Sequence, residues 1–189
     1  MKWGRTEVTW GFCLAAAWLN YLDRQGIFPL ALAACILHEL GHYAAIRCLG
    51  GNIKLIRLTA IGAEMELDAS MDYCREGVAA LAGPGANLLA ALVLCRWPWG
   101  RTFSGLNLVL GCFNLMPVSV MDGGRAMACT LSLLAGPGPA EAVGRVMDRA
   151  VTAAMLVCGA LLAGARWNFT MLLVALWLAA LFWRKRGKR

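Results

Sequence analysis

Long runs of apolar residues constrain this chain more than any other feature of its sequence. Six hydrophobic segments approach the length that crosses a bilayer, at residues 8–22, 27–49, 76–96, 103–121, 149–165 and 167–183. With 60% of its 189 residues hydrophobic, the chain has too little polar surface for a soluble domain of this size. We expect an all-α polytopic membrane protein of about six transmembrane helices, forming a single domain over residues 1–189.

The stretch 53–68 has a different pattern. Apolar residues nearly alternate with charged ones on either side of Gly62. Such alternation is typical of strands, so a short β-hairpin is expected after the second helix. The Gly- and Pro-rich residues 135–139 predict a loop.

The positive charge of the chain is distributed as in a membrane protein. The net charge is +7, but no stretch combines aromatic and basic residues as a nucleic-acid surface does, so nucleic acid is not an expected partner. If the N-terminus is cytoplasmic, the outside loops hold only four of the 18 basic residues, namely Arg24, Arg96, Arg101 and Arg166. The positive-inside rule then predicts that both termini are cytoplasmic. We expect a multi-pass protein of a bacterial cytoplasmic membrane.

The second hydrophobic segment carries the sequence His38-Glu39-Leu40-Gly41-His42. Residues four apart lie on one face of a helix, so the two histidines can offer ring nitrogens to one metal ion. Glu39 projects beside them, where it can act on water rather than bind the metal. This is the arrangement of a zinc-dependent hydrolase.

A chance match must be weighed against this interpretation, because only three residues of the motif are fixed. The chain has two histidines in total, and both belong to the motif. A carboxylate near the bilayer centre costs at least about 2.5–3.5 kcal/mol, and packing does not require Glu39. A functional site is therefore the better explanation.

A catalytic zinc ion usually takes three protein ligands and keeps a fourth position for water. No further histidine exists, and Asp122 is the remaining acidic residue next to a hydrophobic segment away from the obvious loops. It follows Pro117 and precedes two glycines, a backbone able to turn a carboxylate inward. Spacing alone leaves two roles open for Asp122, metal ligand or cap of the following helix.

Three motifs together resemble the site-2 protease family of intramembrane zinc metalloproteases. In the order of that family, they are His38-Glu39-Leu40-Gly41-His42, then Gly83-Pro84-Gly85-Ala86-Asn87, then Asn114-x-x-Pro117-x-x-x-x-Asp122-Gly123. Six spans with cytoplasmic termini are similar to the subgroup of the sporulation protease that processes pro-sigma-K. The chain departs from the family pattern at Val120, where members often have proline, and no PDZ or CBS domain is expected.

The resemblance implies one Zn²⁺ per chain, with Asp122 as the third ligand beside the histidines. It implies a zinc-activated water that hydrolyses peptide bonds, with Glu39 as general base. Residues implied to bind substrate or support the site are Asn87, Asn114, Pro117, Gly83 and Pro84. One hypothesis is that the Asn87 amide helps to polarise the scissile carbonyl. Another is that the edge of the 53–68 hairpin receives an unwound substrate as an added strand, which proline at Leu55 or Ile56 would impair.

The expected partners are the lipid bilayer and a membrane-spanning or membrane-associated protein substrate, for instance a membrane-tethered transcription-factor precursor. A regulatory membrane protein or a second copy of the chain is a further expected partner. The alternative function is a metal-binding or metal-transporting membrane protein without protease activity. A transport path usually requires several polar binding sites across the membrane. The apolar segments offer few polar residues apart from His38, Glu39, His42 and Asp122. An inactive scaffold would not need Glu39.

Overall fold

A computed structural model describes residues 2–3, 6–59, 62–164 and 170–186. The chain divides into two compact units, Met1–Met116 and Pro117–Arg189, which are described in turn. Helices make up most of both units, as expected from the sequence.

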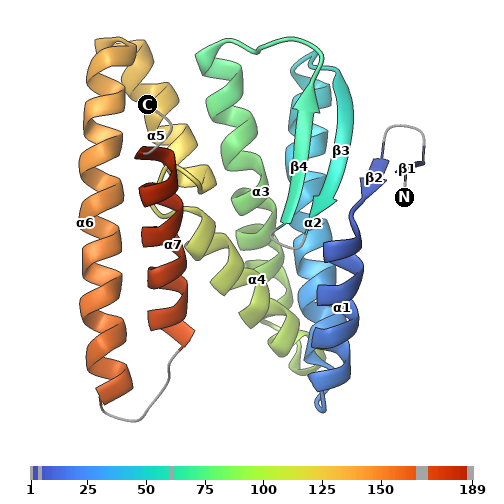
Figure 1. Cartoon of the computed structure of the whole chain (residues 1–189). Helices are drawn as coiled ribbons and strands as arrows, with labels where there is room; N and C mark the ends of the chain where they lie inside the picture. Colours follow the sequence, from blue (N-terminus) through green and yellow to red (C-terminus); the bar gives the residue numbers. More distant parts are fainter. Residues whose placement is uncertain (1, 4–5, 60–61, 165–169, 187–189) are drawn as a thin grey trace. The chain divides into compact units, whose positions relative to one another are not determined.

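In the part of the first unit that the structure describes, the helical elements are four α-helices and one short 3-10 helix. They are α1 (Trp10–Leu22), α2 (Ile27–Cys48), α3 (Tyr73–Leu94), η1 (Pro98–Gly100) and α4 (Arg101–Asn114). Helix α3 packs against both α2 and α4, and α2 also contacts α4 (Figure 1). The helix with the two histidines thus belongs to a three-helix group with α3 and α4.

Small residues allow these helices to approach closely. A Cβ atom on Gly41 of α2 would lie 2.7 Å from the carbonyl oxygen of Ala82 on α3. A Cβ atom on Gly111 of α4 would lie 3.2 Å from the side chain of Leu88 on α3. Close backbone contact of this kind is a major source of helix association in membranes.

A hairpin forms where the sequence predicted it. Strands β3 (Ile53–Thr59) and β4 (Gly62–Leu67) pair antiparallel, with Ile56 opposite Met65. The sequence did not reveal two short N-terminal strands, β1 (Lys2–Trp3) and β2 (Thr6–Val8). Strand β2 pairs parallel with β3, so the sheet has the order β1-β2-β3-β4 and β3 is an inner strand.

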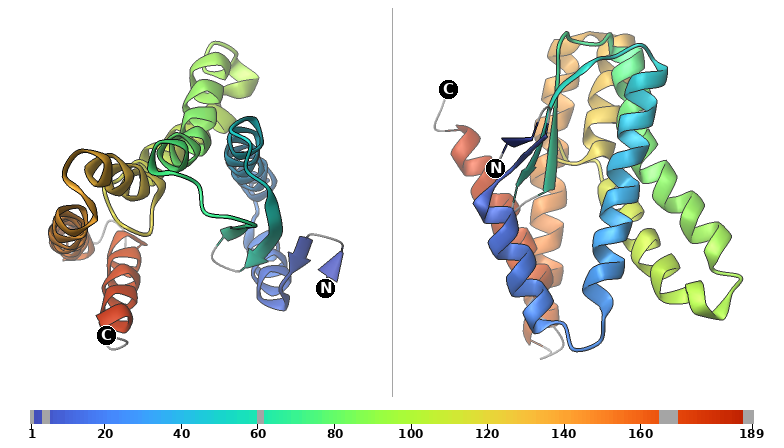
Figure 2. Two further views of the ribbon diagram at one scale, coloured as in Figure 1. Left: turned by 90° about the horizontal axis from the view of Figure 1, so that it is seen from above. Right: turned by 90° about the vertical axis from the view of Figure 1, so that its right-hand side faces the viewer.

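The hairpin is anchored by its apolar face. Ile53 joins Ile46 of α2 and Ala79 of α3 in a buried cluster, and Met65 and Leu67 of β4 pack against that cluster. Figure 2 shows the sheet beside α2. Since Ile46 is one helical turn beyond His42, this packing holds the sheet near the predicted site.

The described residues of the second unit form three helices. They are α5 (Asp122–Ala135), α6 (Pro137–Gly164) and α7 (Thr170–Arg186). Helix α6 packs against both α5 and α7. Helix α5 was absent from the six hydrophobic segments, because it has only 14 residues and begins with Asp-Gly-Gly-Arg.

The loop predicted over 135–139 is shorter in the structure. Helix α5 ends at Ala135, Gly136 adopts a φ of 88°, and α6 begins directly at Pro137. The loop prediction is therefore correct only for Gly136 and wrong for Ala135 and residues 137–139. Proline is compatible with a first helical turn, because the N–H that it lacks would have no partner within the helix.

Three helices in the described part of the chain are long and apolar enough to cross a membrane, namely α2, α3 and α6. The shorter helices α1, α4, α5 and α7 have 13, 14, 14 and 17 residues. A straight span needs about 20 residues. The chain is thus a mostly helical membrane protein, and the count of six spans stays a prediction.

Candidate metal centre and active site

The two histidines of α2 meet through their ring nitrogens. Both side chains are buried, and His38 Nε2 lies 3.1 Å from His42 Nε2. The rings are nearly perpendicular, at 82°. One turn of helix therefore brings two metal-ligating atoms to a single point, as the spacing predicts.

The other nitrogen of each ring is held by an oxygen acceptor on α3. His38 Nδ1 donates to Asn87 Oδ1 at 2.5 Å, and His42 Nδ1 donates to the carbonyl oxygen of Ala79 at 2.8 Å. A neutral imidazole with its proton on Nδ1 carries its lone pair on Nε2. Both neutral rings thus direct a lone pair toward the same point.

These residues fit a zinc ion. Two lone pairs facing each other across 3.1 Å repel, and a cation bound to both nitrogens removes that repulsion. Zn–N bonds of about 2.0–2.1 Å in a tetrahedral site place two nitrogens about 3.3 Å apart, close to the observed separation. Metal-binding histidines commonly donate their second N–H to a carbonyl or carboxylate, as both histidines do here.

Asn87 supports the site from α3. Its side chain is 0% exposed, and its Nδ2 donates to the carbonyl oxygen of Ala34 at 3.1 Å and to Asn107 Oδ1 at 2.7 Å. Both amide hydrogens are used, which leaves none for a substrate carbonyl. The hypothesis that Asn87 polarises the scissile bond is therefore wrong for this arrangement, in which its oxygen orients His38.

Gly83 and Pro84 shape α3 where it meets His42. A Cβ atom on Gly83 would overlap the His42 ring. Pro84 lies inside the helix and has no N–H to offer the carbonyl of Ala80, which disturbs the backbone ladder there. This is the turn of α3 in which the Ala79 carbonyl accepts from His42. The pair thus makes room for the imidazole.

Glu39 follows His38 on α2 and is half-buried, so it is less enclosed than either histidine. Asn114 ends α4, where its Nδ2 donates to the carbonyl oxygen of Leu110 at 3.1 Å. Part of its amide is thus engaged with its own helix.

Asp122 is the first residue of α5 and is buried. Met121 occupies the N-cap position, so the alternative role of Asp122 as a helix cap is wrong. The carboxylate lies 3.9 Å from Arg125 one turn later. Its position in the first turn also suits the positive end of the helix dipole.

The loop before Asp122 is held from both sides within the second unit. Pro117 begins it, Val118 is fully buried, and a Cβ atom on Gly124 would overlap the Val118 backbone. Asp148 of α6 accepts from the backbone N–H of Ser119 at 2.7 Å and from its hydroxyl at 2.6 Å. The sequence gives no sign of this contact, because Ser119 and Asp148 are 29 residues apart.

No protein-family model matches the chain. Among curated proteins, it is similar to a zinc metalloprotease of Methanocaldococcus jannaschii, with 31% identity over 163 residues. It is also similar to Rip3 of Mycobacterium tuberculosis, likewise named as a zinc metalloprotease, with 29% identity over 201 residues. These alignments cover 79% and 92% of the chain but 46% of each relative, so the chain spans about half the length of both.

A solved structure gives a fuller match. The site-2 protease from Methanocaldococcus jannaschii aligns with a TM-score of 0.68 and 27% identity, over 94% of this chain and 89% of that one. The chain belongs to the site-2 protease family. The resemblance drawn from the three motifs is thereby confirmed.

In this member of the site-2 protease family, two residues outside the motifs support the site. Asp148 is one, and Asn107 is the other. Asn107 of α4 is 0% exposed and completes the hydrogen bonding of Asn87. The signal that could have revealed it is an amide side chain within an apolar segment, where a polar group is costly and usually functional.

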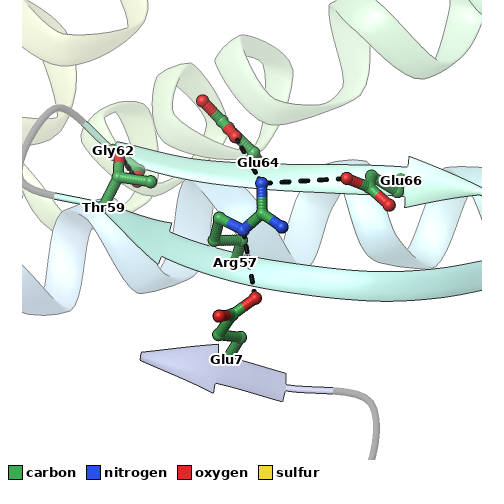
Figure 3. A network of polar contacts seen from close by, with 6 residues as sticks. All are labelled: Glu7, Arg57, Thr59, Gly62, Glu64 and Glu66. Atoms are coloured by element: carbon green, nitrogen blue, oxygen red, sulfur yellow. Dashed lines mark hydrogen bonds and ion pairs between the residues drawn. The ribbon is translucent and has the colours of Figure 1, made fainter. Parts of the chain in front are cut away.

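A network of charges ties the N-terminal strand to the hairpin (Figure 3). Arg57 of β3 donates from Nε to Glu7 of β2 at 3.1 Å, and lies 4.0 Å from Glu64 and 3.9 Å from Glu66 of β4. The hydrogen bond that Arg57 donates to Glu7, and then the negative charge of Glu7, raise the pKa of Arg57. These groups are partly exposed, so the ion pairs contribute little to the free energy of folding.

Proposed function

We propose that this chain is an intramembrane zinc metalloprotease that hydrolyses peptide bonds of membrane-embedded or membrane-tethered proteins. The observation that carries the proposal is the pair of Nε2 atoms 3.1 Å apart, with both Nδ1 atoms held by acceptors. The pair lies on α2, a helix long and apolar enough to span a bilayer, with Glu39 next to His38. The names of the relatives support the same activity.

We propose His38, His42 and Asp122 as the zinc ligands. Two histidines and one carboxylate are a common ligand set for catalytic zinc, with the fourth position left for water. The fixed loop before α5 and the burial of Asp122 support the assignment, because a ligand must be held in place before the metal binds. Family membership supports it as well.

The residues then divide the chemistry between them. Zinc, when bound, supplies a Lewis acid and lowers the pKa of a water ligand to about 7. Glu39 takes the proton of the attacking water and returns it to the leaving amine. Asn87 and the Ala79 carbonyl keep the two imidazoles in the tautomer that this chemistry requires.

We also propose that an unwound substrate segment adds to the sheet at β4. A peptide bond inside a helix must be exposed before hydrolysis, and in lipid its freed backbone groups need new partners. In the described residues β4 pairs only with β3, so its outer edge can supply those partners. Leu55 and Ile56 lie on the inner strand β3, so proline there would disrupt the sheet itself and β4 is the better place for a test.

The proposed setting is a bacterial cytoplasmic membrane, with six spans and both termini in the cytoplasm. The proposed substrate class includes transcription-factor precursors, as in the sporulation-protease subgroup. A regulatory membrane protein or a second copy of the chain would control access to the site.

The test compares metal content and cleavage for the purified parent chain, Glu39→Gln and the control Glu141→Gln. Glu141 is exposed on α6 and pairs with Arg145, so the same chemical change there leaves the site intact. The substrates are a panel of single-span and membrane-tethered precursor segments. We expect one zinc per chain in all three proteins. Cleavage should fall by about 10²-fold or more in Glu39→Gln alone, because the general base is lost.

Other outcomes would contradict the proposal. Absence of zinc from the parent would refute the metal site. Zinc in all three proteins, together with zinc flux into vesicles and no cleavage, would favour the transporter alternative.

A further inference from the structure

We propose that Asn107 of α4 is a positioning residue for the metal centre, which acts on His38 through Asn87. The inference rests on the proposed role of His38 as a zinc ligand. It assigns a function to a buried polar side chain that lies outside the three sequence motifs.

A chain of hydrogen bonds crosses three helices. It begins at the carbonyl oxygen of Phe103, which accepts from Asn107 Nδ2 at 2.8 Å. Asn107 Oδ1 then accepts from Asn87 Nδ2 at 2.7 Å, and Asn87 Oδ1 accepts from His38 Nδ1 at 2.5 Å. Both asparagines are 0% exposed, so no solvent competes for these contacts.

The direction of this chain decides which nitrogen of His38 carries the proton. A backbone carbonyl only accepts, so Phe103 fixes the NH₂ end of Asn107 on its own side and turns the oxygen toward Asn87. Asn87 must then present NH₂ to Asn107 and to the carbonyl of Ala34, and its oxygen to His38. His38 accordingly keeps its proton on Nδ1 and its lone pair on Nε2, the atom next to His42.

Loss of the Asn107 oxygen weakens this control. The amide of Asn87 would then have one acceptor fewer for its NH₂ group, and a half-turn of the amide would become less unfavourable. In the turned form NH₂ would face His38 Nδ1 and favour the proton on Nε2. That tautomer cannot bind zinc through Nε2.

A purely structural role for Asn107 is the competing explanation, because its contact with Asn87 also links α3 to α4. Ser104 provides the matched control. It lies one turn earlier on α4, is buried, and donates from Oγ to the carbonyl oxygen of Ala91 on α3 at 2.7 Å. Ser104→Ala removes a hydrogen bond between the same two helices that does not lead to His38.

The experiment measures zinc affinity of the full chain in detergent by competition with a chromophoric chelator, and the absorption spectrum with Co²⁺ in place of zinc. Asn107→Leu removes the acceptor with little change in size, and Asn107→Ala repeats the test with a smaller side chain. Asn107→Asp is the conservative rescue. A carboxyl group buried there is protonated, so it keeps an acceptor for Asn87 and a donor for Phe103.

We expect Asn107→Leu and Asn107→Ala to weaken zinc binding by about tenfold, the low end of the range for residues that orient a ligand, and to change the Co²⁺ spectrum. Asn107→Asp should bind zinc as the parent does. Ser104→Ala should lower the unfolding temperature without changing either metal readout. Because Asn107 acts through Asn87, adding Asn107→Leu to Asn87→Leu should cause no further loss of affinity.

Parent-like zinc binding in both Asn107→Leu and Asn107→Ala would overturn the inference and leave the proposed function standing. An equal loss of affinity in Ser104→Ala, or additive losses in the double variant, would also overturn it. Absence of zinc binding from the parent chain would refute the proposed function, and this inference with it.

Discussion

At the scale of single residues, the site depends on what surrounds each imidazole as much as on the imidazoles themselves. His38 and His42 each direct Nδ1 at an oxygen of α3, which leaves Nε2 as the metal-binding atom. The His42 ring lies directly against the α3 backbone at Gly83, where a side chain would overlap the ring.

We therefore predict that Gly83→Ala weakens zinc binding by about 10–100-fold, since the new methyl group displaces the His42 ring. Alanine favours the helix over glycine by about 1 kcal/mol, so the change in helix propensity should not destabilise the folded state. Gly85→Ala is the control, because a Cβ atom there meets nothing within 4 Å. Zinc affinity and helix content measured on both variants check the prediction. Equal zinc loss in Gly85→Ala would contradict it.

At the scale of structural elements, the segment that precedes α5 decides where Asp122 lies. Gly124 lies close against the Val118 backbone, and Ser119 donates two hydrogen bonds to Asp148 of α6. Helix α6 thus acts on a proposed zinc ligand that belongs to another helix.

Asp148→Ala should lower zinc affinity by about tenfold, because the loop loses both hydrogen bonds. Ser119→Ala should have a smaller effect, since its backbone N–H still donates to Asp148. Glu141→Ala, on the exposed surface of the same helix, serves as the control. Chelator competition gives the three affinities, and a loss no greater in Asp148→Ala than in Glu141→Ala would argue against this role of the loop.

At the scale of the whole molecule, metal binding is linked to folding, because an unfolded chain does not hold its metal ligands together. A ligand that binds only the folded chain stabilises it by mass action, by about 2.7 kcal/mol at a free concentration of 100 times Kd. Zinc should accordingly stabilise the entire chain and not only α2.

Removal of zinc with a chelator should lower the unfolding temperature of the parent chain in detergent. The double variant His38→Ala/His42→Ala should unfold at the same temperature with and without chelator, because it has lost both nitrogen ligands. A parent chain whose unfolding is indifferent to chelator would contradict the prediction.

The membrane-protein class, the hairpin over 53–68 and the family could be predicted from the residues alone. These features are local, because hydropathy, alternation and a four-residue spacing all act within one helix or strand. Packing of the folded chain determines that β2 pairs with β3 and that a separate helix, α5, begins at Asp122. It also determines the partners of the ligands, from Asn107 through Asn87 to His38. Such contacts join residues tens of positions apart, and they form only when packed helices bring buried polar groups within hydrogen-bonding distance of each other.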